Sequence, residues 1–123
     1  MIVRLPVPPA TNNLFVNKKV GGRFISPAYK AWRTEAGWAL KLRKPALQVF
    51  GPIPVEIWLM VPRKPVNRDI DNFAKGPLDL LVAHGIISDD KQVARLTIER
   101  HDDDDLILNV EQFSRPSAFM WPT

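Results

Sequence analysis

The spacing of hydrophobic residues along the chain predicts four β-strands. Apolar residues alternate with others over residues 2–7, 53–61, 93–100 and 106–113, which is the period of a strand with one buried face. Pro6 places the first strand at a sheet edge or near its own end. The acidic segment HDDDD, residues 101–105, joins the last two strands and predicts that they form a hairpin.

A period close to 3.6 residues predicts two helices. Ser26 and Pro27 are typical of a helix start, and Pro45 ends the first helix after residue 44. The second helix is expected at about residues 71–84, where His84 and Gly85 provide a C-terminal stop. The first helix is expected to face the core with Tyr29, Trp32, Ala36, Ala39 and Leu40.

The first predicted helix also carries a second apolar stripe, formed by Ala31, Trp38 and Leu42 on nearly the opposite side. Such a helix is either buried on two sides or part of a subunit interface. A single small sheet cannot cover both faces, so the pattern favours an interface and hence a homodimer.

The predicted elements follow the order β-α-β-α-β-β. This order indicates an α/β (α+β) fold, in which helices pack on one mixed sheet. A chain of 123 residues suits a single domain, which we assign to residues 1–113. Prolines, asparagines and glycines predict a long loop at residues 8–26. Residues 114–123 are predicted to be a C-terminal tail, either disordered or docked on a partner.

Charge is distributed unevenly along the chain. Residues 1–50 hold nine Lys and Arg and a single acid, Glu35, whereas residues 51–123 hold eight basic and twelve acidic residues. A basic half suits nucleic acid, because Lys and Arg that meet phosphates release condensed counterions. The alternative is a basic surface that serves solubility alone.

Several classes of protein are excluded or disfavoured by composition. The chain has no cysteine, which excludes a disulfide framework and thiolate zinc sites. It shows no signal-peptide layout and no apolar run near 18 residues, so a soluble intracellular protein without a membrane partner is expected.

The strongest candidate for chemistry is the pair Asp69 and Asp71. If this stretch is extended, both carboxylates project from one face, where they repel each other unless a cation neutralises them. Mg²⁺ prefers such oxygen ligands, and Asp89-Asp90 offers a further carboxylate if the chain folds back. The alternative is that Asp71, or Asn72, caps the following helix and that Asp69 is solvated.

Lys75 follows Asp71 by four residues and precedes Asp79 by four. It forms either an ordinary ion pair on a helix surface or a positive group that stabilises charge on a phosphate under attack. The adjacent Gly76-Pro77 costs a helix one hydrogen bond and some entropy, and is interpreted as a tolerated local irregularity.

From Arg68 to Arg100 the sequence resembles the RusA-type crossover junction endodeoxyribonucleases, whose core reads R-D-x-D-N-x-x-K, a short helix ending at glycine, and D-D-x-x-V. The opening LPVPPATNN is similar to the family's LPxPPSxN, with threonine in place of the usual serine. Gly76-Pro77 and the longer aromatic tail depart from the family pattern.

The resemblance implies a homodimeric, Mg²⁺-dependent enzyme without a small-molecule cofactor, which resolves Holliday junctions in the cytoplasm of a bacterium or of a phage-infected host. It implies that Asp69, Asp71 and Asp90 bind the metal and that Lys75 is the essential lysine, with Asp89 the less certain member of its pair. Contacts to branched DNA are expected from Asn12, Asn13, Lys18, Lys19, Arg23 and Arg68.

Three other functions stay open on the sequence alone. A non-catalytic nucleic-acid-binding module would use the basic half but would leave the aspartates unexplained. A metal-dependent nuclease acting on flaps, other branched DNA or RNA would use the same residues as a resolvase. A protein-interaction adaptor would depend on the Trp38 stripe and the tail.

Overall fold

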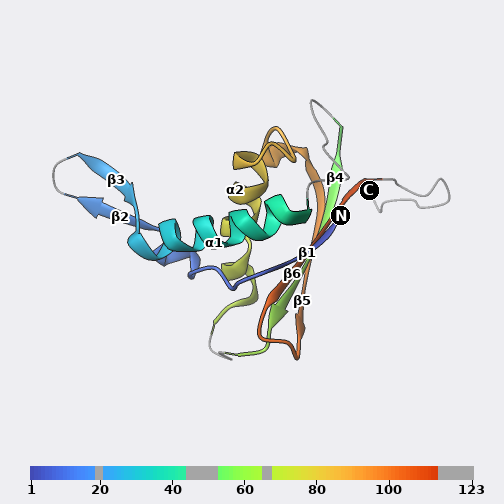
Figure 1. The fold of residues 1–123 in the computed structure, drawn as a ribbon, viewed down its shortest axis with the longest axis horizontal. Helices are drawn as coiled ribbons and strands as arrows, with labels where there is room; N and C mark the ends of the chain where they lie inside the picture. The colour runs from blue at the N-terminus through green and yellow to red at the C-terminus, as the bar shows by residue number, and fades with distance from the viewer. Residues whose placement is uncertain (19–20, 44–52, 65–67, 114–123) are drawn as a thin grey trace, which may run out of the picture.

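The computed structural model describes residues 1–18, 21–43, 53–64 and 68–113, and centres on a four-stranded mixed sheet with strand order β1-β6-β4-β5. Helices α1 (Pro27–Arg43) and α2 (Lys75–Ala83) pack against one face of this sheet (Figure 1). The predicted α+β class, with a mixed sheet and two helices, is confirmed. The strands are β1 (Ile2–Leu5), β4 (Val55–Pro62), β5 (Val93–His101) and β6 (Leu106–Gln112).

Strand β4 lies between β5, which runs parallel to it, and β6, which runs antiparallel. The predicted hairpin of the last two strands is therefore wrong, because β4 separates them. The acidic connection crosses the end of β4, where the Arg63 N–H donates to the His101 carbonyl and the Arg63 guanidinium pairs with Asp102 at 2.5 Å. Neighbouring strands lie about 4.8 Å apart, so a short connection is long enough to span the two spacings.

The pairing of β4 with β5 contains a register shift. Val55 pairs with Val93 but Glu56 pairs with Arg95, so Ala94 is an extra residue in β5. An extra residue changes which side chains face the core. Beyond the shift, Arg100 is opposite the buried Val61 and so faces the helices.

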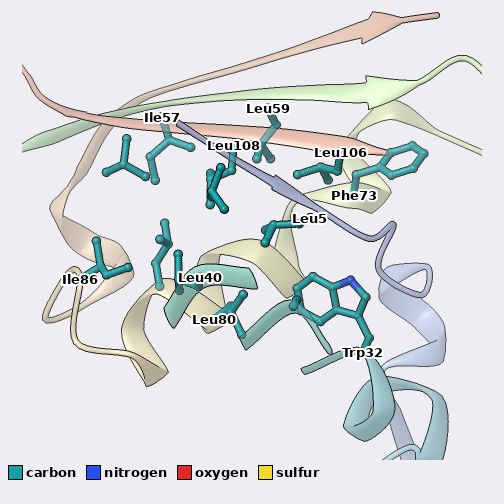
Figure 2. Close-up of a cluster of buried hydrophobic side chains, with 14 of the residues drawn as sticks. Leu5, Trp32, Leu40, Ile57, Leu59, Phe73, Leu80, Ile86, Leu106 and Leu108 are labelled. Carbon is teal, nitrogen blue, oxygen red and sulfur yellow. The ribbon is translucent and has the colours of Figure 1, made fainter. Parts of the chain in front are cut away.

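The hydrophobic core forms between the sheet and the two helices (Figure 2). The predicted inward face of β4 and the predicted core stripe of α1 are confirmed: Tyr29, Trp32, Ala36, Leu40, Val55, Ile57, Leu59 and Val61 are buried, and Ala39 packs partly buried beside them. The indole N–H of Trp32 donates to the Pro6 carbonyl at 2.8 Å, which ties α1 to the chain after β1. On the opposite side of α1, Trp38 is 62% exposed and Leu42 is 84% exposed.

The predicted helix at 71–84 is divided into a 3₁₀ turn, η2 (Ile70–Phe73), and α2. Pro77 lacks the N–H that would bond to the Phe73 carbonyl, so it suits the first turn of α2, where it lies, and not the interior of a longer helix. Gly76 has a packing reason: a Cβ there would lie 3.1 Å from Cβ of Pro8 and 3.4 Å from the Trp32 ring.

Helix α2 ends as the sequence predicts. His84 is the C-cap of α2, and Gly85 follows with φ 70°, a conformation that favours glycine. The Gly85 N–H donates to Val82 O and the Ile86 N–H donates to Leu81 O, the bond pattern of a Schellman motif.

The predicted loop at residues 8–26 contains secondary structure that the sequence pattern did not reveal. A 3₁₀ turn, η1 (Thr11–Asn13), is followed by the antiparallel strands β2 (Phe15–Lys18) and β3 (Gly22–Ile25), which form a separate two-stranded sheet. Figure 1 shows this hairpin projecting beyond the start of α1. Gly21 and Gly22 have φ of 94° and 82°, which suits the turn between the strands. The predicted tail at 114–123 and the predicted end of α1 at Lys44 and Pro45 lie outside the described residues.

Candidate active site

The first two candidate metal ligands lie on and beside the turn η2. Asp69 is extended and precedes the turn, whereas Asp71 is inside it, so the pair does not meet the condition of an extended stretch with both carboxylates on one face. Neither side chain caps a helix: η2 and α2 both begin without a side-chain cap. Both aspartates are exposed, and neither carboxylate forms a hydrogen bond or an ion pair with another described residue.

The backbone beneath these carboxylates is held firmly. The N–H groups of Asn72 and Ala74 donate to the carbonyls of Asp69 and Asp71, at 3.0 and 3.2 Å. Between them, Phe73 is fully buried in the core (Figure 2). The main chain of the turn is thus fixed while its two carboxylates stay free to bind a cation.

The N-terminal motif and Arg68 both bind this turn. The Thr11 hydroxyl donates to the Asn72 carbonyl at 3.2 Å, and Nη2 of Arg68 donates to the same oxygen at 3.0 Å. The Arg68 guanidinium also stacks on the Phe73 ring, 3.8 Å from its centroid, and burial lowers the pKa of Arg68. Much of this side chain is therefore occupied by contacts within the chain.

Lys75 begins α2, directly after the turn, and forms an ion pair with Asp79 at 3.3 Å. This is the helix-surface pair that the spacing allowed. Asp79 also accepts a hydrogen bond of 3.2 Å from the hydroxyl of Tyr29, a buried residue of α1. Burial, together with the negative charge of Asp79, raises the pKa of Tyr29 to about 12. Tyr29 thus stays protonated at neutral pH and anchors the carboxylate that Lys75 contacts.

The second acidic pair lies before β5, where Asp90 starts a 3₁₀ turn, η3 (Asp90–Gln92). Asp89 caps this turn: its carboxylate accepts the Lys91 N–H at 2.9 Å, a bond that is the main cause of its lowered pKa. The Gln92 side chain bonds back to the N–H of Asp89, which completes a capping box. Asp89 therefore has a structural role, although both aspartates are exposed.

One chain does not gather the three candidate metal ligands. Among residues 1–18, 21–43, 53–64 and 68–113, no group of three or more His, Asp or Glu side chains is placed to hold a metal ion. Asp90 precedes β5, whereas the turn that carries Asp69 and Asp71 is bonded near the other end of that strand. The seven steps along β5 from Val93 to Arg100 correspond to roughly 20 Å, which is the length of strand between the two acidic turns.

A pocket beside α2 is lined by both Asp90 and Asp79, the partner of Lys75. Its volume is about 410 Å³, and its lining includes Asp79, Asp89 and Asp90 together with Tyr29 and Arg33. Lys75 pairs with Asp79, and Asp79 shares this pocket with Asp90. Of the other predicted site residues, Lys75 is therefore the one linked to Asp90 through a common neighbour.

The predicted DNA contacts surround a smaller hollow and the hairpin. Asn12 and Arg23 line a hollow of about 210 Å³ together with Thr11, Phe15 and Asn17. Asn13 is exposed on η1, and Lys18 ends β2. The predicted contact Lys19 lies outside the described residues. The guanidinium of Arg23 stacks on Phe15, 4.0 Å from its ring centroid.

A larger basic groove runs along α1. It has a volume of about 930 Å³, and its charged lining residues are the cations Arg23, Lys30, Arg33 and Lys41, with His84 at one side. Among the described residues that line it there is no aspartate or glutamate. Desolvation, followed by the charges of Lys41 and Arg33, lowers the pKa of His84, so its ring is mostly neutral near pH 7.

Comparison with known proteins identifies the kind of molecule that carries this arrangement. The model of the family described as endodeoxyribonuclease RusA matches residues 6–111, which include both acidic turns and the N-terminal motif from Pro6 onward. The chain belongs to this family. A relative from Aquifex aeolicus (strain VF5), named crossover junction endodeoxyribonuclease RusA, is 28% identical over 116 residues, which cover 92% of this chain and 90% of the relative.

Membership of the RusA family makes the protein an endodeoxyribonuclease by class and confirms the predicted resemblance. No helix in the described part of the chain is long and apolar enough to cross a membrane. Sequence reasoning missed Thr11 as a contact of the turn and Tyr29 as a partner of Asp79, because the groups to which they donate, on Asn72 and Asp79, are distant in sequence.

Proposed function

We propose that this RusA-family protein is a divalent-metal-dependent endonuclease that resolves four-way DNA junctions, as in recombination and repair. The observation that carries the proposal is the region of turn η2, next to Lys75. Its backbone is held by hydrogen bonds, and its two exposed carboxylates, Asp69 and Asp71, have no partner among the described residues. The name of the Aquifex relative supports the choice of junction DNA as substrate. A bacterial or phage-infected cytoplasm would be the place of action.

Asp69 and Asp71 fit a site for Mg²⁺, because they supply hard oxygen ligands that no described side chain occupies. Bound there, the ion would polarise the scissile phosphate and lower the pKa of a water molecule. Lys75 is close in sequence and would turn from Asp79 to the phosphate, where its charge would stabilise the transition state. Asp90 would serve as the third carboxylate.

A second copy of the chain would supply Asp90 to this site. Within one chain, roughly 20 Å of strand separates the two acidic turns. The exposed Trp38 and Leu42 on α1 give an apolar surface suited to a homodimer. A two-fold dimer would present two equivalent sites to a four-way junction, so that symmetric nicks would follow from the symmetry.

The DNA arms would lie on the basic surface beside the acidic turn. Asn12 and Arg23 share one hollow, and η1 is bonded to η2 through Thr11 and Asn72. Lys18, Lys19 and the groove cations would add phosphate contacts. Arg68 would contact DNA with the part of its guanidinium that Asn72 and Phe73 leave free.

The direct test is incubation with synthetic four-way junction, flap and linear duplex DNA, in Mg²⁺ and in chelator. Paired nicks in the four-way junction, dependent on Mg²⁺ and absent from duplex, are expected. Cleavage of flaps at an equal rate would instead indicate a nuclease for branched DNA in general. Binding without cleavage at any Mg²⁺ concentration would contradict the proposed activity.

Sharing of Asp90 between subunits has its own test. Asp71→Asn and Asp90→Asn each inactivate both sites of a homodimer. If Asp90 acts across the interface, a mixed dimer of the two variants has one site with all its carboxylates intact. Co-expressing the variants should then restore nicking of one strand. If each subunit uses its own Asp90, every site in the mixture is damaged and no activity returns.

A further inference from the structure

Arg100, near the end of β5, binds backbone carbonyls on both sides of residues 65–67. Its Nη1 donates to the carbonyls of Pro62 and Arg63, at 3.1 and 3.2 Å, at the end of β4. Its Nη2 donates to the carbonyl of Arg68. One guanidinium thus joins the last residues of β4 to the residue that precedes Asp69.

The hydrogen bond from Arg100 to the Arg68 carbonyl fixes the plane of the peptide unit that joins Arg68 to Asp69. A carbonyl shares its rigid plane with the next N–H, so holding the Arg68 oxygen also holds the nitrogen of Asp69. Further along the chain, the carbonyls of Asp69 and Asp71 accept hydrogen bonds from the N–H groups of Asn72 and Ala74. Arg100 is therefore the contact that secures the entrance of the turn, while Asn72 and Phe73 secure its interior.

We infer that Arg100 is a positioning residue for the proposed metal site, which holds the entrance of η2 so that Asp69 and Asp71 are placed to bind a cation. The inference rests on the proposed function. Its physical basis is the shape of the side chain: the planar guanidinium presents separate nitrogens in a fixed fork, so three carbonyls on two segments are held together. A lysine ammonium is a single point and cannot reproduce this spacing.

The test compares the parent with Arg100→Lys, and uses Arg95→Lys as the matched control. Arg95 lies on the same strand, where it pairs with Glu56 at 3.3 Å and faces away from η2. The first measurement is amide hydrogen exchange by NMR in metal-free protein. In Arg100→Lys, the amides of Asn72 and Ala74 should exchange about 10-fold faster, while amides of β4 and β6 keep their protection.

The second measurement is the Mg²⁺ concentration that gives half-maximal cleavage of a four-way junction. It should rise about 10-fold in Arg100→Lys, which is typical when a group that orients metal ligands is changed. The maximal rate at high Mg²⁺ should recover most of the parent value. Junction affinity in chelator should be unchanged, because the fork of Arg100 is occupied by carbonyls and not by phosphates.

The possible outcomes are distinct. An unchanged Mg²⁺ midpoint together with unchanged exchange at Asn72 and Ala74 would overturn the inference while leaving the parent's activity intact. Faster exchange throughout the sheet, or an unfolded variant, would show that Arg100 stabilises the whole domain and would also overturn it. Absence of Mg²⁺-dependent cleavage by the parent would contradict the proposed function, and the metal-free exchange experiment would still report on Arg100.

Discussion

Tyr29 provides a sharp test of the structure, because it is the chain's single tyrosine. Its side chain is 1% exposed and its hydroxyl donates to Asp79, the carboxylate that also pairs with Lys75. Burial is the main reason, and the charge of Asp79 the second, that its pKa rises to about 12. Replacing Tyr29 with phenylalanine removes the titrating group and keeps most of the ring packing.

The sign of the pH effect follows from the two pKa values. The pKa of tyrosine in an unfolded chain is about 10, so the unfolded state loses its proton first as the pH rises. The contribution of the protonated hydroxyl to the free energy of unfolding is therefore complete below pH 10 and is lost between pH 10 and 12. A shift of this size predicts a loss of about 1 kcal/mol by pH 11.

The assay is urea unfolding of the parent and of Tyr29→Phe at several pH values from 7 to 11. At pH 7 the variant should be less stable by about 1 kcal/mol, because the Asp79 carboxylate loses a hydrogen bond. Between pH 9 and pH 11 that difference should shrink by about 1 kcal/mol, because only the parent carries the titrating group. Lysines and arginines titrate alike in both proteins and cancel.

Ultraviolet absorbance of tyrosinate checks the same prediction directly, since one residue gives one titration curve. In the folded parent, ionisation should begin well above pH 10. A midpoint near 10 in the folded state, or stability curves that stay parallel up to pH 11, would refute the burial and the Asp79 contact.

The other predictions concern the site. Asp71→Asn should leave the free energy of unfolding within about 0.5 kcal/mol of the parent, because the carboxylate is exposed and bonds to no described residue. Junction binding should stay intact while cleavage falls at least about 100-fold, and equal cleavage in Mg²⁺ would contradict the metal-site proposal. Lys75→Ala should lose only a few tenths of a kcal/mol from the Asp79 pair in urea unfolding but most of its cleavage rate, and a fully active variant would leave Lys75 as a surface ion pair. Changing both Arg23 and Lys30 to alanine should lower the log–log salt slope of junction binding by about 1.8, and an unchanged slope would mean that the groove does not touch phosphates. Light scattering at micromolar concentration should give a dimer, and a monomer would contradict sharing of Asp90.

Features that depend on local periodicity were predictable from the sequence. The inward residues of β4 and the core stripe of α1 follow from periods of two and 3.6 residues, and both are buried as expected. The glycine stop at Gly85 follows from the conformational freedom of glycine. The place of Trp38 and Leu42 opposite the core stripe was predictable too, but the sequence left open whether they are buried within the chain, and the structure exposes both.

Features that depend on distant partners were not predictable. The alternation of the last two strands is the same whether they pair with each other or flank β4, so the sequence pattern could not give the strand order. The helix pattern did not explain the glycine at position 76. Its reason is the close approach of Pro8 and Trp32, which lie far from Gly76 in the sequence. The neighbours of the candidate site, such as Thr11, Tyr29 and Arg100, are likewise brought there by tertiary structure alone.

The extra residue Ala94 sets the distance between the two acidic turns as a spacer would. It lies between the Asp90 turn, at the start of β5, and Arg100, which is bonded to the Asp69 turn at the other end. Removing it would leave Arg95 opposite Glu56 and every later pair in place, but would draw Asp90 along the strand by up to about 3.3 Å. In a dimer that shares Asp90, this one position would adjust how far a carboxylate of one subunit extends toward the cation held by the other.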